Sequence, residues 1–261
     1  MIESPVQLLE KQEGFRRVVF SMKKFLTDPG KTGIIAEFKR KSPSKGIIND
    51  SANIEEVTAA YTSHGASMIS VLTDGPSFGG STNDLVSARF NQLPILRKDF
   101  ILDPYQIVES RAMGADVILL IAACLRPDET AALAAFAHQM GLEVLLEIHD
   151  EKDLDHLCDE VDVVGINNRD LKTFTVDTDR SIRLAERLPF DKLRIAESGI
   201  RDVETMNRMK YAGFHGFLIG EQFMKAPDPA IAFASFADQL KKNLYESKGL
   251  RNDATPSGKK T

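Results

Sequence analysis

The sequence predicts an α/β fold, a (β/α)8 TIM barrel with an N-terminal helical extension. From residue 33 onward, a short apolar run rich in β-branched residues is followed by an amphipathic helical pattern, and this unit occurs eight times. Strands that alternate with helices pair in parallel, and continuously apolar strands indicate a sheet buried on both faces. No nucleotide-binding fingerprint follows the first strand, so the eight units favour a barrel over a doubly wound sheet.

Residues 1–30 are expected to form one or two helices that precede the barrel. Leu8 and Leu9 lie on one apolar stripe, and a second stripe recurs at helical spacing over residues 18–26. The Asp-Pro-Gly sequence at 28–30 is expected to end the second helix, because proline and glycine interrupt helical backbone.

The strands and helices of the repeat alternate along the rest of the chain. The strands are expected at 34–38, 68–72, 95–98, 116–121, 143–148, 161–166, 193–196 and 216–219. The helices are expected at 54–64, 82–91, 104–113, 127–140, 151–158, 178–188, 202–212 and 229–245. Asp103 and Asp228 each precede a proline, the composition of a helix N-cap and first turn. The glycines that follow helices, where a left-handed residue is wanted, are Gly65, Gly114, Gly141 and Gly213.

The composition is typical of a globular protein. Of 261 residues, 43% are hydrophobic and 27% are charged, which is enough to bury a sizeable core. The net charge of −5 argues against a general nucleic-acid binder. Cys124 and Cys158 are the only cysteines, which fits a reducing compartment. Neither a signal peptide nor a membrane-spanning run is evident, so we expect a cytoplasmic protein without membrane contact.

We expect residues 1–246 to form a single barrel domain that includes the helices of 1–30. A barrel of this length forms one domain. Residues 247–261 are polar and lack periodicity, so we expect them to form a disordered tail.

Charged residues gather at the carboxyl ends of the expected strands. The first strand leads into Glu37 and Lys39, which share one face because alternate residues of a strand point to the same side. The third strand contributes Lys98, the fifth Glu147 and the seventh Glu197. In a barrel these ends meet on the face where the chemistry lies. Because burying unpaired charge is expensive, three carboxylates and two lysines here indicate a catalytic site.

Nearby charged residues have a structural interpretation. Arg97 and Asp99 flank Lys98 with opposite parity, so they are expected to point outward into ion pairs. Asp170 is expected to support the loop after the sixth strand. His149 is interpreted as an outward or N-cap neighbour, not as a catalyst. None of the five histidines has a metal-ligand spacing, and the sequence predicts no metal site.

Two loops near the end of the barrel suggest a phosphate site. Ser198 and Gly199 precede one helix, and Gly220 precedes a short helical turn at 221–225. Backbone N–H groups at a helix N-terminus bind anions, and barrels commonly place phosphate at the loops after strands seven and eight. Lys39, on the adjacent first strand, is expected to supply the countercharge.

Phe78 lies in the segment Ser-Phe-Gly-Gly-Ser after the second strand. The glycines beside it allow a backbone or a ligand to come close. Two interpretations stay open here: Phe78 anchors the loop, or it forms a wall of a substrate site.

Six ordered segments carry a resemblance to a family. They are Ile-Ile-Ala-Glu-Phe-Lys-Arg-Lys-Ser-Pro-Ser, Leu-Arg-Lys-Asp-Phe-Ile, Leu-Leu-Glu-Ile-His, Gly-Ile-Asn-Asn-Arg-Asp-Leu, Ala-Glu-Ser-Gly-Ile and Gly-Phe-Leu-Ile-Gly. Together they resemble the indole-3-glycerol-phosphate synthase family of tryptophan biosynthesis, over residues 33–236. The resemblance implies a carboxy-lyase that converts 1-(2-carboxyphenylamino)-1-deoxyribulose 5-phosphate into indole 3-glycerol phosphate, carbon dioxide and water. It implies no cofactor.

The resemblance also implies roles for individual residues. Lys98 is implied as the general acid and Glu147 as the general base, while Glu37 and Lys39 line the site. The implied substrate-binding residues are Glu197, Asn167 and Arg169, the latter two at the anthranilate end, and Ser198, Gly199 and Gly220 at the phosphate. Since Lys39 and burial lower the pKa of Lys98 while Glu37 and Glu147 raise it, we expect coupled titration and a bell-shaped kcat profile.

Two features depart from the family pattern. Members carry a longer helical extension near the active-site mouth, so we expect that cap to be shortened here. Glu221 follows Gly220, and its carboxylate is expected to turn away from the phosphate. The basic loop at 40–45 is interpreted as a mobile lid, with Pro43 and Gly46 as the limits of its motion.

Three alternatives stay open from the sequence. A phosphosugar isomerase would share the phosphate loops without needing this set of charged strand ends. A catalytically silent barrel would have lost some of them, and none is missing. A nucleic-acid or targeting patch at 39–45 conflicts with the acidic net charge. We expect a monomer that binds a phosphorylated small molecule, with association with other tryptophan-pathway enzymes left open.

Overall fold

Parallel strands close into a barrel, as the repeat predicts. The computed structural model describes residues 5–170 and 173–252, and within these the barrel has eight strands. They are β1 Ile34–Phe38, β4 Met68–Leu72, β5 Ile95–Lys98, β6 Val117–Ile121, β7 Glu143–Ile148, β8 Val163–Asn167, β9 Leu193–Glu197 and β10 Gly216–Ile219. Each strand pairs with the next in chain order, and β10 pairs with β1 to close the ring. The expected strands are confirmed, with differences at their ends.

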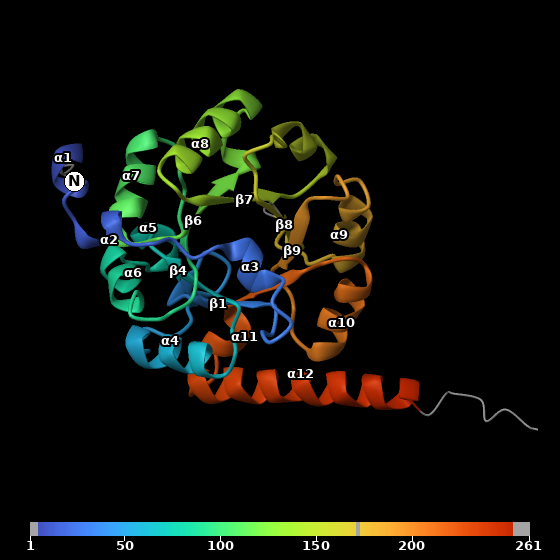
Figure 1. Cartoon of the computed structure of the whole chain (residues 1–261). Helices are drawn as coiled ribbons and strands as arrows, with labels where there is room; N and C mark the ends of the chain where they lie inside the picture. The colour runs from blue at the N-terminus through green and yellow to red at the C-terminus, as the bar shows by residue number, and fades with distance from the viewer. Residues whose placement is uncertain (1–4, 171–172, 253–261) are drawn as a thin grey trace, which may run out of the picture.

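Helices surround the barrel on its outside (Figure 1). They are α4 Ile54–Ser63, α5 Gly75–Phe78, α6 Thr82–Ala88, α7 Pro104–Met113, α8 Pro127–Gln139, α9 Thr178–Ala185, α10 Val203–Tyr211, α11 Glu221–Met224 and α12 Pro229–Asn252. Asp103 caps α7 in a capping box with Gln106, and Gly114 ends the helix at φ 89°. Local sequence chemistry therefore sets these helix boundaries.

The helix expected at 151–158 is wrong in type. The chain instead forms a 3-10 helix, η2, at Glu151–His156. The Asp153 carboxylate accepts hydrogen bonds from the backbone N–H groups of His149 and Asp150, which tightens the turn after β7. The segment is too polar to present the apolar stripe of a longer helix. A second 3-10 helix, η1, spans Ala122–Cys124 after β6.

The N-terminal extension forms α1 Val6–Leu9, α2 Glu13–Arg16 and α3 Met22–Leu26, whereas one or two helices were expected. The buried Asp116 carboxylate interrupts it: Oδ1 lies 2.7 Å from Arg17 Nη2 and accepts a 2.7 Å hydrogen bond from Phe20 N. The chain is thus held extended between α2 and α3.

The helix α3 closes the amino-terminal end of the barrel, where it lies across the ring of strands (Figure 1). Met22 and Leu26 are buried among inward-facing side chains that include Ile35, Leu96 and Leu145. The extension is therefore anchored at the end opposite the expected active site, and the described part of it builds no cap over the mouth. The apolar layer next to α3 separates this helix from the charged residues at the carboxyl ends of the strands.

The C-terminal helix α12 packs along α4 and α10 on the outside of the barrel (Figure 1). It continues to Asn252, so residues 247–252, which were expected in the tail, are helical. The remaining tail, 253–261, lies outside the described residues. Within the described ranges, every helix is too short or too polar to cross a lipid bilayer.

The basic loop after β1 contains a small hairpin that the sequence did not predict. Lys41–Ser42 (β2) pairs antiparallel with Gly46–Ile47 (β3). The Arg40 guanidinium forms an ion pair with Asp84 of α6, and Lys41 Nζ donates to the carbonyl of Pro76 at 3.1 Å. These contacts tie the start of the loop to the outer helices, so only its tip overhangs the barrel mouth.

Candidate active site

The carboxyl ends of the strands enclose a cavity of about 270 Å³. Every residue selected from the sequence lines it: Glu37, Lys39, Phe78, Lys98, Glu147, Asn167, Arg169, Glu197, Ser198, Gly199 and Gly220. They come from β1, β5, β7, β8, β9 and the loops after β4, β8, β9 and β10. Inward parity and strand-end position identified the charged residues of this set, while loop chemistry and the family resemblance supplied the others.

Lys98 lies at the centre of the charged group. Its Nζ is 2.7 Å from Glu147 Oε2 and 3.1 Å from Glu197 Oε2. The Lys98 side chain is 14% exposed and both carboxylates are almost fully buried. The ammonium is thus shared between two carboxylates in a site with little water, where charge interactions are strong.

Glu37 and Lys39 form a second pair on β1. Lys39 Nζ lies 2.5 Å from Glu37 Oε1, and Glu37 is 3% exposed. Lys39 is thus engaged with Glu37, and β1 lies next to β10, whose loop contains Gly220. The expectation that the charges of Glu37 and Glu147 raise the pKa of Lys98 is confirmed, and Glu197, which was not named for this effect, also raises it and contacts Lys98 directly.

The two partners of Lys98 differ in pKa. Burial by itself would raise the pKa of Glu147, but the charges of Lys98 and His149 and hydrogen bonds from Lys98 and Asn167 lower it to about 2. Burial dominates at Glu197, where the charges of Glu147 and Glu37 oppose the attraction of Lys98, and its pKa rises to about 8. Glu147 is therefore the partner that stays ionised, and Glu197 is the partner that takes up a proton more readily.

Lys98 remains the ammonium ion. Burial acts to lower its pKa, but the charges of Glu147, Glu197 and Glu37, together with the hydrogen bond to Glu147, outweigh burial and raise the pKa above its ordinary value. The protonated lysine and the ionised Glu147 form a pair in which a proton donor and a proton acceptor lie 2.7 Å apart.

Asn167 and His149 hold the Glu147 carboxylate from its other side. Asn167 Nδ2 donates to Glu147 Oε1 at 3.0 Å, and His149 Nε2 lies 3.4 Å from the same oxygen. His149 was interpreted as an outward or N-cap neighbour. It does precede Asp150, the N-cap of η2, but its ring does not point outward: it faces Glu147 and is 12% exposed. The available signal was its i+2 spacing from Glu147, which gives the two residues the same parity.

Arg169 and Glu221 meet across the mouth of the cavity. Arg169 Nη2 lies 3.6 Å from Glu221 Oε2, with side chains 23% and 36% exposed. The Glu221 carboxylate, in the segment after β10, thus turns toward a cation in the loop after β8, with β9 between the two strands. Asn167 Oδ1 accepts a hydrogen bond from Arg169 N at 3.0 Å, which fixes the start of this loop.

The loop after β9 has an unusual backbone. Ser198 at φ 66° and Gly199 at φ 71° are consecutive left-handed residues, a conformation in which successive N–H groups line a concave anion site. Asn168 Nδ2 donates to the Ser198 carbonyl at 2.7 Å and holds the turn. Gly199 cannot carry a side chain, because a Cβ there would overlap Val176.

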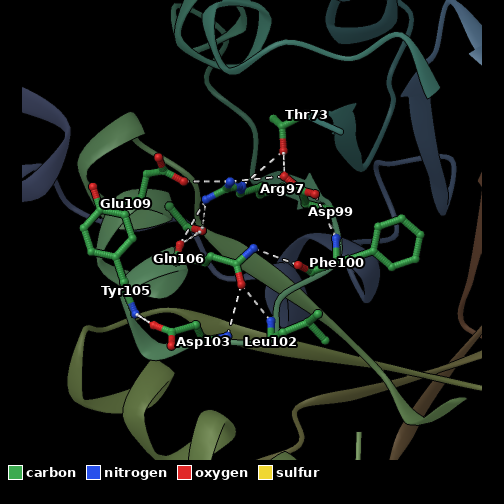
Figure 2. Close-up of polar contacts among 10 residues, drawn as sticks. Thr73, Arg97, Asp99, Phe100, Leu102, Asp103, Tyr105, Gln106 and Glu109 are labelled. Carbon is green, nitrogen blue, oxygen red and sulfur yellow. Dashed lines mark hydrogen bonds and ion pairs between the residues drawn. The ribbon is translucent and has the colours of Figure 1, made fainter. Parts of the chain in front are cut away.

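A polar network on the outer side of β5 joins Arg97 and Asp99, the chain neighbours of Lys98, to α7 and reaches Phe100 (Figure 2). As the parity argument predicts, Arg97 points outward, and its guanidinium lies 3.1 Å from Asp99 Oδ2 and 2.8 Å from Glu109 Oε2. Arg97 also donates to Thr73 Oγ1 and to the Gln106 carbonyl. The network thereby joins β5 and the segments after β4 and β5 to α7 on the outside of the barrel.

Gln106 extends this network to the loop that follows Lys98 (Figure 2). Its amide donates to the Phe100 carbonyl at 2.8 Å and accepts from the N–H groups of Leu102 and Asp103. The Phe100 ring, which also lines the cavity, lies 6.3 Å from that of Phe78. The two rings form an aromatic wall. Phe100 was missed in the sequence although it shares the parity of Lys98.

Further lining residues come from loops whose course the sequence did not predict. They are Ser42, Pro43, Cys124, Phe174, Arg201 and Lys225, among others. Among the described residues, no three His, Cys, Asp or Glu side chains are placed to hold a metal ion.

The sequence comparisons show the family. Residues 3–236 match the model of a family described as indole-3-glycerol phosphate synthase. A protein of that name from Bacteroides thetaiotaomicron is 48% identical over 234 residues, which cover 88% of this chain and 90% of the relative. Another of the same name, from Salinibacter ruber, is 41% identical over 251 residues, 95% and 93% of the two chains.

Solved structures share the fold at low identity. The tryptophan synthase alpha subunit of Legionella pneumophila superposes with a TM-score of 0.61 at 11% identity, over 86% of this chain and 98% of that one. A structure described as native KDPGal has a TM-score of 0.60 at 17% identity, over 85% and 97% of the two chains. At such identities the likeness supports the barrel fold alone.

Proposed function

The chain belongs to the indole-3-glycerol phosphate synthase family, and on this premise we propose how its own residues carry out the reaction. The enzyme is a carboxy-lyase of tryptophan biosynthesis. It closes the ring of 1-(2-carboxyphenylamino)-1-deoxyribulose 5-phosphate, with loss of carbon dioxide and water, and releases indole 3-glycerol phosphate.

The Lys98–Glu147 pair supports the proposed catalytic roles most directly. One ammonium and one carboxylate, 2.7 Å apart, lie at the bottom of a cavity with an aromatic wall on one side and left-handed backbone on another. The reaction needs a proton donor at a ketone oxygen and a proton acceptor at the ring carbon, and this pair supplies both.

Lys98 is the proposed acid of ring closure. An aromatic carbon attacks the substrate ketone, and negative charge develops on the ketone oxygen. The Lys98 ammonium is protonated at neutral pH and stabilises that charge before transferring its proton. Its two carboxylate partners keep it in place until the substrate arrives.

Decarboxylation needs no group beyond the substrate itself. The anilino nitrogen supplies electrons to the ring for closure, and the iminium that forms accepts the electron pair released with carbon dioxide. We therefore propose that the enzyme requires no cofactor and no metal. Prolonged dialysis against a chelator is expected to leave turnover unchanged.

Glu147 is the proposed base of the last step. Loss of the hydroxyl group as water needs a second proton at that oxygen, which Lys98 supplies after solvent has reprotonated it, and removal of a proton from the pyrroline ring. The low pKa of Glu147, about 2, keeps it ionised and ready to accept that proton. Asn167 orients the carboxylate with its 3.0 Å hydrogen bond. Glu37 and Lys39 complete the charged ring around the reacting atoms.

The ends of the substrate fit the two sides of the cavity. We assign the phosphate to Ser198, Gly199 and Gly220, with Lys39 as countercharge, since left-handed backbone presents N–H groups to an anion. The anthranilate ring is assigned to the wall of Phe78 and Phe100. Its carboxylate is assigned to Arg169, whose planar fork matches a carboxylate.

We propose that the tip of the β2–β3 hairpin acts as the lid. Ser42, Pro43 and Ser44 line the cavity, whereas Arg40 is fixed to Asp84 and lies outside the moving part. Limited proteolysis with and without product tests this: ligand is expected to protect the tip, and equal cleavage in both states would exclude a lid.

We also propose that the enzyme is a cytoplasmic monomer whose ligand is a phosphorylated small molecule and not nucleic acid. The net charge of −5 supports the last point. Light scattering at several concentrations measures the oligomeric state, and a concentration-dependent mass would contradict the monomer.

Turnover of the carboxyphenylamino-deoxyribulose phosphate, followed by indole fluorescence, tests the assignment as a whole. The Glu147→Gln variant is expected to slow the removal of the ring proton in the last step and to lower kcat by about 10²- to 10⁴-fold, the range for loss of an acid–base group. An unaltered kcat would remove Glu147 from the proton transfers.

A further inference from the structure

Gly165 occupies an inward-facing position of β8, two residues before Asn167. Its backbone is that of an ordinary strand: it pairs in register with Glu147 on β7 and with Ile195 on β9. It is not among the glycines with positive φ. Nothing in the backbone conformation at this position requires a glycine.

The space that a side chain would occupy at 165 is filled by Glu197. A Cβ built on Gly165 would overlap Oε1 of Glu197 and would lie 3.2 Å from its carboxyl carbon. The next neighbour is a methyl group, Leu145 Cδ1, at 3.3 Å. The three nearest atoms thus belong to side chains, and the severe overlap is with a carboxylate alone.

Other glycines of the barrel differ from Gly165. At Gly14 and Gly80 a Cβ would meet backbone atoms, so the fold itself requires glycine there. At Gly79 and Gly199 the backbone is left-handed. Gly220 is a partial parallel, because a Cβ there would meet Glu37, but it would also approach the Cβ of Glu37 at 2.9 Å. Gly165 combines an ordinary strand backbone with a severe overlap that involves only the far end of a side chain, the carboxylate of Glu197.

The Glu197 carboxyl group is buried from solvent, and within the described part of the chain only one of its two oxygens has a polar partner. Its Oε2 lies 3.1 Å from Lys98 Nζ, while its buried Oε1 has no hydrogen-bond partner among the described residues. Leaving a buried carboxylate oxygen unpartnered is costly. No hydrogen bond therefore fixes Oε1, and the shape of the space over Gly165 decides where it lies.

We propose that Gly165 is a positioning residue: the missing side chain lets the Glu197 carboxyl group lie across β8, within reach of Lys98. The proposal rests on the proposed function, in which Lys98 is the acid and Glu197 contacts the substrate. A methyl group at 165 pushes the carboxyl group up toward the cavity mouth and away from the lysine, into space that the substrate needs.

The first test is Gly165→Ala in the full-length chain. Because the overlap is with a side chain that can rotate, the variant is expected to fold. A misplacement of about 1 Å at a reacting centre can cost about a hundredfold, so kcat is expected to fall by about that factor. Val163→Ile is the matched control, since it adds one carbon to the same inward face of β8, below the charged layer. It is expected to change kcat by less than about threefold.

The second test separates a clash with Glu197 from general overpacking. Aspartate at 197 is one methylene shorter, so its carboxyl group no longer reaches the space over Gly165. Gly165→Ala is therefore expected to lower kcat about a hundredfold in the natural chain, and less than about threefold when added to Glu197→Asp. Equal losses in both backgrounds would overturn the proposal. If Gly165→Ala does not fold on its own, a folded Gly165→Ala/Glu197→Asp double variant supports the clash with Glu197. If the double variant does not fold either, the proposal is overturned.

A structural readout makes the outcome independent of turnover. In a crystal structure of Gly165→Ala, the Glu197 carboxyl group is expected beyond hydrogen-bond distance from Lys98 Nζ, and an unmoved carboxylate overturns the proposal. If the natural chain fails to convert the carboxyphenylamino-deoxyribulose phosphate, the proposed function fails while this distance still tests the placement of Glu197. If the natural chain turns over and Gly165→Ala matches it, the positioning role alone fails.

Discussion

Residues that lie far from Lys98 in the sequence raise its pKa and keep it protonated. Arg97 and Asp99 are its chain neighbours, yet its direct partners are Glu147 and Glu197, on β7 and β9. Parity in the strand predicted that Lys98 points inward. It did not predict which carboxylates reach the ammonium, because that depends on side-chain lengths and on the space left by Gly165 across the barrel.

Removing the ammonium tests its role as an acid. Lys98→Ala is expected to abolish measurable turnover, a loss of at least about 10³-fold, because the developing oxygen charge loses its partner and its proton source. Binding of indole 3-glycerol phosphate, measured by calorimetry, is expected to persist. Lost binding with a preserved chemical rate would instead assign Lys98 to recognition.

Arg169 and Glu221 give a paired prediction at the mouth. Arg169→Ala is expected to raise KM more than it lowers kcat, because the carboxylate that Arg169 holds must later depart. Glu221→Gln frees Arg169 from its 3.6 Å partner and is expected to lower KM. Steady-state kinetics measures both constants, and an unchanged KM in Arg169→Ala would remove this residue from substrate binding.

The barrel elements were predictable because their chemistry is local. The apolar runs, the N-cap aspartates and the C-terminal glycines gave most strand and helix boundaries within a few residues. One error is local: Asp153 accepts from backbone N–H groups three and four residues before it and tightens the turn after β7 into a 3-10 helix. The other lies where a tertiary contact decides, because Asp116 splits the N-terminal segment into short helices. No pattern in the sequence pairs a residue with a partner a hundred positions away.

Asp116 gives the prediction for these elements. It is fully buried and lies 2.7 Å from Arg17 Nη2, it is ion-paired with Arg89, and it accepts from the N–H of Ile95. Asp116→Ala leaves two buried guanidinium groups without their partner. The free energy of unfolding is expected to fall by about 3–5 kcal/mol. Urea denaturation measures it, while kcat of the folded variant should stay unchanged because the site lies at the other end of the barrel. A loss below about 1 kcal/mol would contradict this anchoring role.

At the scale of the whole molecule, the buried site makes stability depend on pH. The raised pKa of Glu197, about 8, means that the native state holds a proton that the unfolded state releases near its usual value of 4.5. Stability from this group is present below that value and is lost as pH rises toward 8. Glu147 has the opposite effect. Because its pKa is lowered from 4.5 to about 2 in the folded protein, its contribution to stability is present above pH 4.5 and is lost as the pH falls toward 2.

Glu197→Gln isolates the first of these effects. The variant cannot release the proton, so its Tm relative to the natural chain is expected to increase by several degrees between about pH 5 and about pH 9. Calorimetric scans at both pH values measure the difference. A constant difference in Tm across that range would show that Glu197 does not carry a raised pKa in the folded protein.

The central claim is that a protonated Lys98 and an ionised Glu147 perform ring closure and dehydration in one cavity. A single assay tests it most directly: conversion of 1-(2-carboxyphenylamino)-1-deoxyribulose 5-phosphate by the natural chain and by Lys98→Ala, followed by indole fluorescence. Turnover by the natural chain and none by the variant is the predicted result. No fluorescence from the folded natural chain, or equal rates from both, would contradict the account.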